Sequence, residues 1–140
     1  VEVVPDTEFA AAKDQDRGVI LYGNADNNAA WPWLLAQSPV QVRRGVVKIG
    51  DHEQRGDDLA CLFCRPRPGS DHALVAVISG SGAAGLRLTD RVPYFMGGVA
   101  VPDCTVFGTE TLAWGTDGVR VTGYFGNDWS VEKGEFAWRE

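Results

Sequence analysis

The sequence is short of positive charge. Thirteen lysines and arginines stand against 19 aspartates and glutamates, which leaves a formal net charge of −6 at pH 7. The basic residues pair up at only two places, Arg43 with Arg44 and Arg65 with Arg67. Proteins that bind nucleic acid or anionic membranes carry a basic patch or stripe. We therefore expect neither nucleic acid nor a membrane as a partner.

Long apolar runs are missing as well. No stretch approaches the roughly 20 apolar residues that cross a bilayer. The first residues lack the basic and then apolar order of a signal peptide, and their polar, alanine-rich character predicts an N-terminal extension or linker over residues 1–17. Residues 18–140 have the size and composition of one domain. Because the chain does not begin with methionine, we expect a fragment or a processed piece of a longer protein.

Cysteine and histidine are scarce. Three cysteines are an odd number, which argues against a closed disulfide framework. Cys61 and Cys64 have C-x-x-C spacing but lie in an apolar, strand-like run, where residues three apart point to opposite faces. We therefore predict that both are small buried hydrophobic residues. A zinc site with His52 and His72 is an alternative, but its spacing matches no common zinc pattern, and we predict no metal.

Four acidic residues lie close together at Asp51, Glu53, Asp57 and Asp58. Carboxylates suit calcium, but the spacing is not that of an EF-hand loop. The preferred interpretation is a solvated rim beside a hairpin.

Four apolar runs indicate buried strands, at residues 18–23, 59–64, 72–79 and 104–108. Helical patterns at residues 28–37 and 82–95 separate some of them, and Gly50-Asp51 is typical of a hairpin turn. Apolar runs that alternate with helices favour a parallel sheet covered on both faces. The predicted fold is a three-layer α/β/α domain with a mostly parallel sheet, flavodoxin- or Rossmann-like, and a small antiparallel hairpin excursion.

The third run ends in Gly80-Ser81-Gly82-Ala83-Ala84-Gly85, which matches G-x-G-x-x-G. Between a strand and a helix this pattern is typical of nucleotide or phosphate binding, because glycines let a phosphate approach the backbone. The acidic partner of such a fingerprint is poorly placed, and Glu110 is the better candidate. The preferred interpretation is a packing turn, with a phosphate site at Gly80, Ser81, Gly82 and Gly85 as its alternative.

Ligands of parallel sheets bind beyond the carboxyl ends of the strands. The predicted topology brings several polar residues to that rim. They are Asn24, Asp26, Arg65, Arg67, Ser79, Ser81, Thr109 and Glu110. Any small-molecule site is expected among them, with Asn24, Asp26 and Glu110 beside the glycine turn.

Catalytic residues are not predicted. Ser79 and Ser81 flank a sharp turn, but the spacing departs from G-x-S-x-G, and both histidines precede the serines, against the chain order of α/β-hydrolases. We also predict no cofactor.

The five tryptophans suggest a second kind of site, because exposed aromatic rings can bind carbohydrate or protein. Trp31 and Trp33 diverge by about 200° on one helix, so one of them should be exposed. Trp129 and Trp138 near the end raise the same possibility.

Several longer stretches resemble a known group of proteins. They are GVILYGNADNNAAW, GDDLACLFCRPRPGSD, GLRLTDRVPYF and GYFGNDWSVEKGEFAWR. Together they are similar to the C-terminal region of large bacterial prolyl-oligopeptidase- or esterase-like α/β-hydrolase proteins, as found in planctomycetes. The resemblance implies a non-catalytic accessory domain that packs on or supports an upstream hydrolase domain. It also implies a secreted or periplasmic protein. The nucleophile of such a hydrolase would precede this chain.

Overall fold

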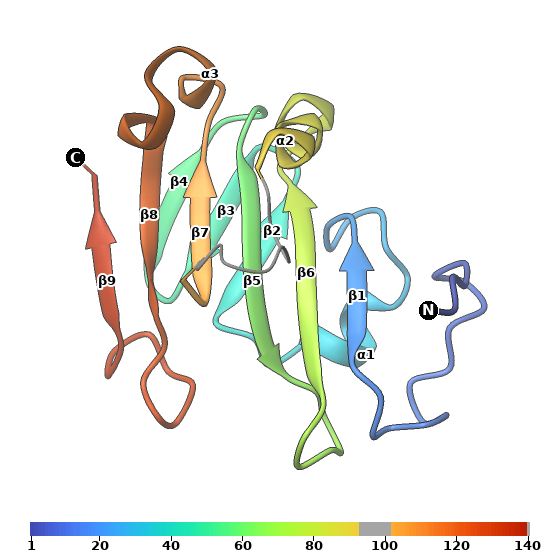
Figure 1. Ribbon diagram of the computed structural model, residues 1–140. Helices are drawn as coiled ribbons and strands as arrows, with labels where there is room; N and C mark the ends of the chain where they lie inside the picture. Colours follow the sequence, from blue (N-terminus) through green and yellow to red (C-terminus); the bar gives the residue numbers. More distant parts are fainter. Residues whose placement is uncertain (93–101, 140) are drawn as a thin grey trace.

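The computed structural model describes residues 1–92 and 102–139, and in these residues it is predominantly a β protein. Strands account for 34% of the described residues and helices for 17% (Figure 1). The strands are β1 (Val19–Tyr22), β2 (Val40–Arg43), β3 (Val46–Ile49), β4 (His52–Arg55), β5 (Ala60–Pro66), β6 (Leu74–Gly80), β7 (Cys104–Phe107), β8 (Val119–Tyr124) and β9 (Glu135–Trp138). The helices are α1 (Trp31–Leu35), α2 (Ala83–Leu88) and α3 (Thr111–Trp114), with 3-10 turns η1 (Thr89–Arg91) and η2 (Gly115–Gly118).

The strands form a six-stranded sheet in the order β1-β6-β5-β7-β8-β9 and a three-stranded sheet in the order β2-β3-β4. Among the described strands, β1 and β6 form the one parallel pair, and every other pair is antiparallel. The prediction of a three-layer, mostly parallel, flavodoxin- or Rossmann-like α/β fold is therefore wrong.

The connection between β5 and β6 explains the error. A parallel pair needs a crossover of a dozen or more residues, usually a helix. Only residues 67–73 separate β5 from β6, so these two strands have to run in opposite directions. A short apolar run indicates a buried strand but says nothing about its direction. The length of the connection was the better signal.

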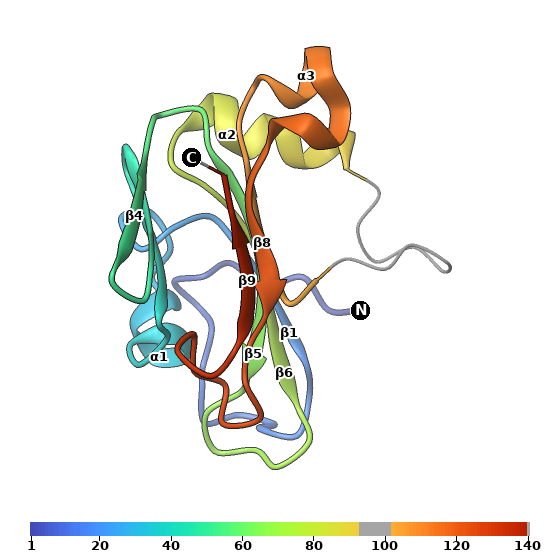
Figure 2. The ribbon, with the colours of Figure 1, turned by 90° about the vertical axis from the view of Figure 1, so that its left-hand side faces the viewer.

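The small sheet covers one face of the large one (Figure 2). The main core lies between them and includes Val42, Val47, Cys61, Val77 and Val106, each at most 1% exposed. Helix α1 closes this layer with Trp31, which lies edge-on to Phe63 at 6.2 Å between ring centroids. The wide apolar β5–β6 pair thus receives its cover from other strands rather than from long helices.

A smaller core lies on the second face of the large sheet, beneath α2 and η1. It consists of Ala60, Leu62, Ile78, Leu88 and Phe107. The helix predicted for residues 82–95 is much shorter here, since α2 and η1 end at Arg91. Residues 93–95 of that prediction lie outside the described residues.

The two ends of the large sheet carry different loops. Strands β1, β6 and β7 end, and β5 and β8 begin, at the end that carries α2 and α3, which we call the turn end (Figure 1). The β5–β6 connection lies at the opposite end, which we call the clamp end. In the described part of the chain, no helix has the length and apolar character needed to cross a membrane.

Candidate functional site

The glycines of the Gly80–Gly85 turn lie against neighbouring backbone. A Cβ on Gly82 would be 2.3 Å from the carbonyl oxygen of Asp57, and one on Gly85 would be 2.0 Å from that of Leu59. A Cβ on Gly80 would be 2.4 Å from the amide nitrogen of Leu86. Close packing between β6, α2 and the loop before β5 therefore requires glycine at these three positions. The geometry supports the packing-turn interpretation, and phosphate binding at this turn stays a prediction.

Two predicted rim residues hold this turn together. The Asn24 side-chain amide donates to the Gly80 carbonyl at 2.8 Å. The Ser81 hydroxyl donates to the Gly56 carbonyl at 2.6 Å and accepts from the Leu59 amide at 3.1 Å. Both side chains are buried, and their polar atoms are engaged with backbone. Ser81 therefore acts as a bridge between the turn and the start of β5.

The acidic rim residues are paired with arginines. Asp26 accepts from the Arg44 amide at 2.7 Å and from the Arg43 guanidinium at 2.6 Å, and its pKa is lowered, first by the Arg44 bond. Glu110 accepts from Arg120 at 2.7 Å, which is the main cause of its lowered pKa. Both carboxylates are therefore held ionised by partners within the chain.

Asn24, Ser81, Thr109 and Glu110 do lie at the turn end. Arg65 and Arg67 do not, and the prediction that they share this rim is wrong. Because β5 is antiparallel to β6, its carboxyl end lies at the clamp end. Ser79 is fully buried on the core face of β6, where its hydroxyl makes no hydrogen bond within the described chain.

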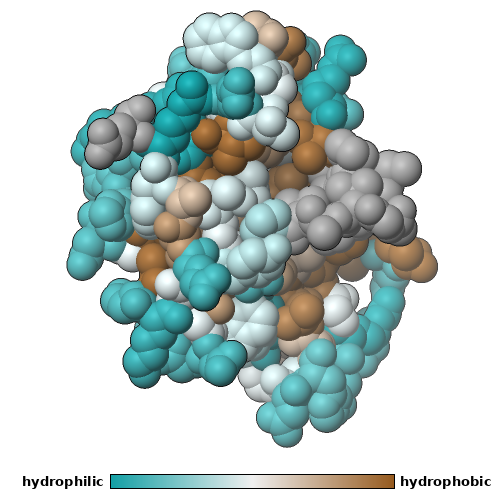
Figure 3. All heavy atoms as spheres, turned by 60° about the vertical axis from the view of Figure 1, so that its left-hand side comes forward, coloured by the Kyte–Doolittle hydropathy of each residue, from teal (hydrophilic) through white to brown (hydrophobic). Residues whose placement is uncertain are grey.

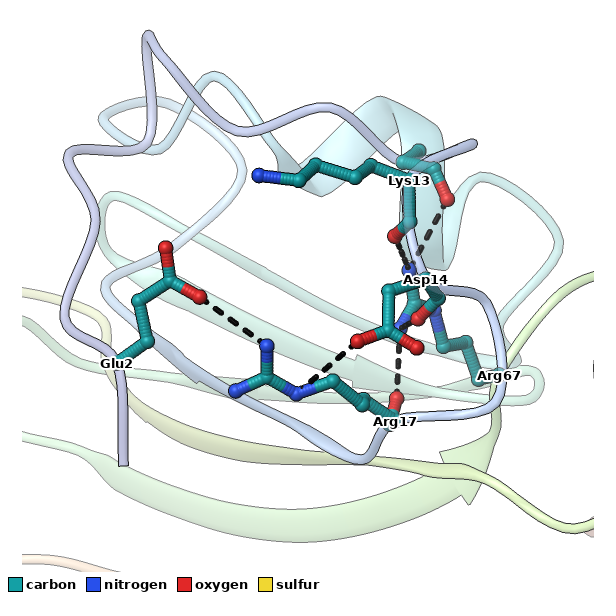
Figure 4. Close-up of polar contacts among 6 residues, drawn as sticks. Glu2, Lys13, Asp14, Arg17 and Arg67 are labelled. Carbon is teal, nitrogen blue, oxygen red and sulfur yellow. Dashed lines mark hydrogen bonds and ion pairs between the residues drawn. The ribbon is translucent and has the colours of Figure 1, made fainter.

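Arg67 is the most elaborate polar centre of the described chain. The residue is only 2% exposed, although it carries a guanidinium. Its two terminal nitrogens donate to four backbone carbonyls of the N-terminal segment (Figure 4). The acceptors are Asp14 at 2.9 Å, Arg17 at 2.6 Å, Ala11 at 3.0 Å and Lys13 at 3.3 Å. We call this arrangement the Arg67 clamp.

Further contacts place the N-terminal segment against the domain. Phe9 packs on the main core and lies 5.9 Å from the Arg67 guanidinium, in cation–π geometry. The Ser70 hydroxyl donates to Asp16 at 3.2 Å, and the Ala29 amide donates to Asp6 at 2.6 Å. Residues 1–17 were predicted as an extension or linker. Their second half lies on the domain and is held there by specific hydrogen bonds.

Sequence reasoning missed the clamp. Arg67 stands in the turn-forming stretch RPRPGSD, where a charged residue is expected to be solvated. The carbonyls that it binds belong to a segment with no apolar periodicity. The chemistry of this site lies in backbone groups, which no side-chain motif reveals.

The cysteines separate as the strand alternation predicts. Cys61 is fully buried in the main core beside Cys104, and Cys64 is half-buried on β5. Burial and the neighbouring Asp103 carboxylate raise the pKa of the Cys64 thiol to about 11. All three are free thiols.

Among residues 1–92 and 102–139, no group of three or more histidine, cysteine or acidic side chains is placed to bind one metal ion. The acidic residues from 51 to 58 are dispersed. Glu53 pairs with Arg55 at 2.6 Å, and Asp58 accepts from the Thr109 hydroxyl at 2.5 Å.

The tryptophans divide between core and surface. Trp31 is 2% exposed and Trp33 is 66% exposed, which confirms that one of the pair faces solvent. Trp114 on α3 is also exposed at 62%. Helices α1 and α3, which carry these two residues, lie well apart in both views (Figures 1 and 2). Carbohydrate binding stays a prediction.

Comparison with known proteins adds no relative. Protein-family models, curated proteins and solved structures all give no match to this chain.

Proposed function

We propose that this chain is a non-catalytic accessory domain of a larger, secreted hydrolase, and that residues 1–17 connect it to that protein in a fixed position. The Arg67 clamp is the observation that carries this proposal. A free linker needs no binding site on the domain that follows it, whereas here a buried cation binds four carbonyls of the segment. The hydrolase itself comes from the resemblance of the sequence.

The energetics of the clamp support a role in positioning. A buried cation is costly to desolvate unless its donors are satisfied, and hydrogen bonds to charged groups stabilise by about 1.5–3 kcal/mol each. Both terminal nitrogens of Arg67 are satisfied, whereas its buried Nε makes no hydrogen bond with any described residue. Because the four carbonyls can bind Arg67 in only one arrangement of the segment, the clamp favours that arrangement over the many conformations of a flexible linker. An accessory domain held in one orientation can support or shape a neighbouring catalytic domain.

The positions of the serines and histidines support the non-catalytic part. Ser79 and Ser81 are buried, and the Ser81 hydroxyl bonds to backbone on both sides. His52 stacks on Trp138, and His72 is exposed in the β5–β6 connection at the other end of the sheet. Neither histidine is placed to take a proton from either serine.

Hydrolysis by the isolated chain is the direct test. We expect 4-nitrophenyl esters and prolyl 4-nitroanilides to release product no faster with the purified chain than in buffer. Turnover that exceeds buffer and disappears in the Ser79→Ala or Ser81→Ala variant would contradict the proposal. A serine-hydrolase inhibitor that carries a fluorophore gives an independent readout, since labelling of the folded chain would have the same meaning.

A further inference from the structure

A cleft lies between the β3–β4 turn and strand β9. Its volume is about 230 Å³, and its walls include Asp51, His52, Glu132, Phe136 and Trp138. We call it the β4–β9 cleft. The side of the molecule that carries β8 and β9 shows apolar and weakly polar residues along its middle, between hydrophilic ones (Figure 3). The cleft belongs to neither the glycine turn nor the Arg67 clamp.

Aromatic rings form one wall of the cleft. The His52 ring stacks on Trp138 with centroids 4.2 Å apart, and Phe136 follows at 5.9 Å from Trp138. Further along, Phe125 lies 5.5 Å from Phe136 and 6.1 Å from Trp129. The result is a continuous aromatic row from the small sheet to the loop between β8 and β9.

One end of this row already binds a guanidinium. The Arg65 guanidinium carbon lies 5.1 Å from the Phe125 ring centroid and 5.8 Å from that of Trp129, and Arg65 also donates to the Trp129 carbonyl. Aromatic faces attract cations, and arginine most often. The aromatic row therefore already binds one guanidinium group from within this chain.

The other end of the row has carboxylates without a cation. Asp51 and Glu132 line the cleft, and neither makes an ion pair or a side-chain hydrogen bond with any described residue. Lys133, the residue next to Glu132, is committed to Asp128 at 2.8 Å. Aromatic rings beside two unpaired carboxylates are complementary to a guanidinium, which uses both its flat face and its fork of donors.

We propose that the β4–β9 cleft binds the guanidinium group of an incoming arginine side chain or small guanidinium compound. Asp51 and Glu132 accept its hydrogen bonds, and the guanidinium packs against the part of the Phe136–Trp138 wall that His52 leaves uncovered. Arg65 makes the corresponding cation–π contacts with Phe125 and Trp129. This proposal does not depend on the accessory role, because it concerns only groups in this cleft.

The test is a titration of the full chain labelled with 5-fluorotryptophan and followed by fluorine NMR. Five tryptophans give five resonances, and a Trp138→Phe variant assigns the one in the cleft. The probe is N-acetyl-arginine amide, and its neutral control is N-acetyl-citrulline amide. We expect the Trp138 resonance to shift with saturation at up to about 50 mM of the arginine probe and to remain in place with the citrulline probe.

The Asp51→Asn/Glu132→Gln variant should bind the arginine probe about fivefold more weakly or worse. An Asp117→Asn/Glu8→Gln variant makes the same change of net charge at exposed positions away from the cleft and should bind like the original chain. Unchanged resonances of the other four tryptophans report that each variant is folded.

Two further probes distinguish a small compound from a polypeptide side chain. They are agmatine and a Gly-Gly-Arg-Gly-Gly peptide, and the natural type of ligand should have the lower dissociation constant. Equal shifts with the citrulline probe, a response to methyl glycosides alone, or no saturable shift would overturn the proposal.

Discussion

The two ends of the large sheet use opposite strategies to fix a loop. At the turn end, three glycines remove side chains so that β6, α2 and the loop before β5 approach within contact of their backbones. At the clamp end, one large charged side chain enters the protein and collects four carbonyls of a distant segment. The first arrangement is local and matches a familiar pattern. The second joins residues 50 or more positions apart and matches none.

The difference shows how far a motif can be trusted. The G-x-G-x-x-G pattern describes where a backbone can approach another group, but it does not say whether that group is a phosphate or the protein itself. Here Leu59 and Asp57 occupy the space that the glycines open. Arg67 has no motif, yet its burial and four acceptors give the clearest indication of a specific role. Substitutions at each end measure how much its glycines or its arginine stabilise the fold.

Gly85→Ala should have the largest effect. The new Cβ would lie 2.0 Å from the Leu59 oxygen and 2.5 Å from its carbonyl carbon, and neither backbone atom can move without displacing β5. We expect a loss of about 3 kcal/mol in the free energy of unfolding, measured by urea denaturation. Gly45→Ala is the matched control, with φ at +76° but no atom within 4 Å, and should cost only about 1 kcal/mol. Equal losses would show that packing is not what the turn requires.

Arg67→Met comes next. Methionine keeps much of the apolar stem but leaves four carbonyls without their charged donor, so we expect a loss of about 2–3 kcal/mol. The control is Arg17→Met. The Arg17 side chain is half-exposed and pairs with Glu2 at 3.1 Å and Asp14 at 3.4 Å, and its loss should cost at most about 1 kcal/mol. Urea denaturation compares the two, and an Arg67 variant as stable as the Arg17 variant would remove the energetic argument for the clamp.

Asp58→Asn tests the loop that faces the glycine turn. Hydrogen bonds from Thr109 lower the pKa of Asp58, so its carboxylate stabilises the fold above the unfolded pKa of about 4. This stabilisation is lost as the pH falls through the lower, folded pKa. At pH 7 the variant should be less stable by about 1 kcal/mol, and the difference should shrink toward zero near pH 2 to 3. Asp57→Asn, with an exposed side chain, should change little at any pH, and a pH-independent difference for Asp58→Asn would contradict the assignment.

The smallest expected effect concerns Cys64, which lies on β5 between the two ends of the sheet. Its thiol pKa of about 11 leaves little thiolate at pH 8, so alkylation by iodoacetamide should be roughly 100-fold slower than for an unperturbed cysteine. Peptide mapping by mass spectrometry separates Cys64 from the two buried cysteines. The urea-unfolded chain is the control and should react at the ordinary rate at all three positions. Reaction of folded Cys64 within a few-fold of free cysteine would show that its surroundings are not as described.

The positions of the strands could be predicted from the sequence better than their arrangement. Apolar runs located β1, β5, β6 and β7 to within two residues. Their directions depend on connection lengths, and the short β5–β6 connection outweighs the alternation of apolar runs with helical patterns. Hydrophobic patterning reports burial, and a strand covered by a second sheet has the same pattern as one covered by helices. The helical stretches proved too short to form outer layers.

The candidate site was predicted only in part. Asn24, Ser81 and Glu110 reach the same end of the sheet as the glycine turn because β1, β6 and β7 do run in one direction. Arg67 could not have been placed, because its partners are carbonyls of residues 11–17 and carry no side-chain signature. The β4–β9 cleft brings residues 51 and 132 together across two sheets, which local sequence does not encode.

Order of the N-terminal segment is the most direct test of the central claim, that the Arg67 clamp holds residues 11–17 on the domain. Backbone ¹⁵N relaxation of the full chain gives order parameters for Lys13 and Arg17, whose amides donate to Ala10 and Asp14. We expect values of about 0.85, as in the core strands, and a fall below about 0.6 in Arg67→Met while the strands keep theirs. Low values in the original chain, or unchanged values in the variant, would contradict the account.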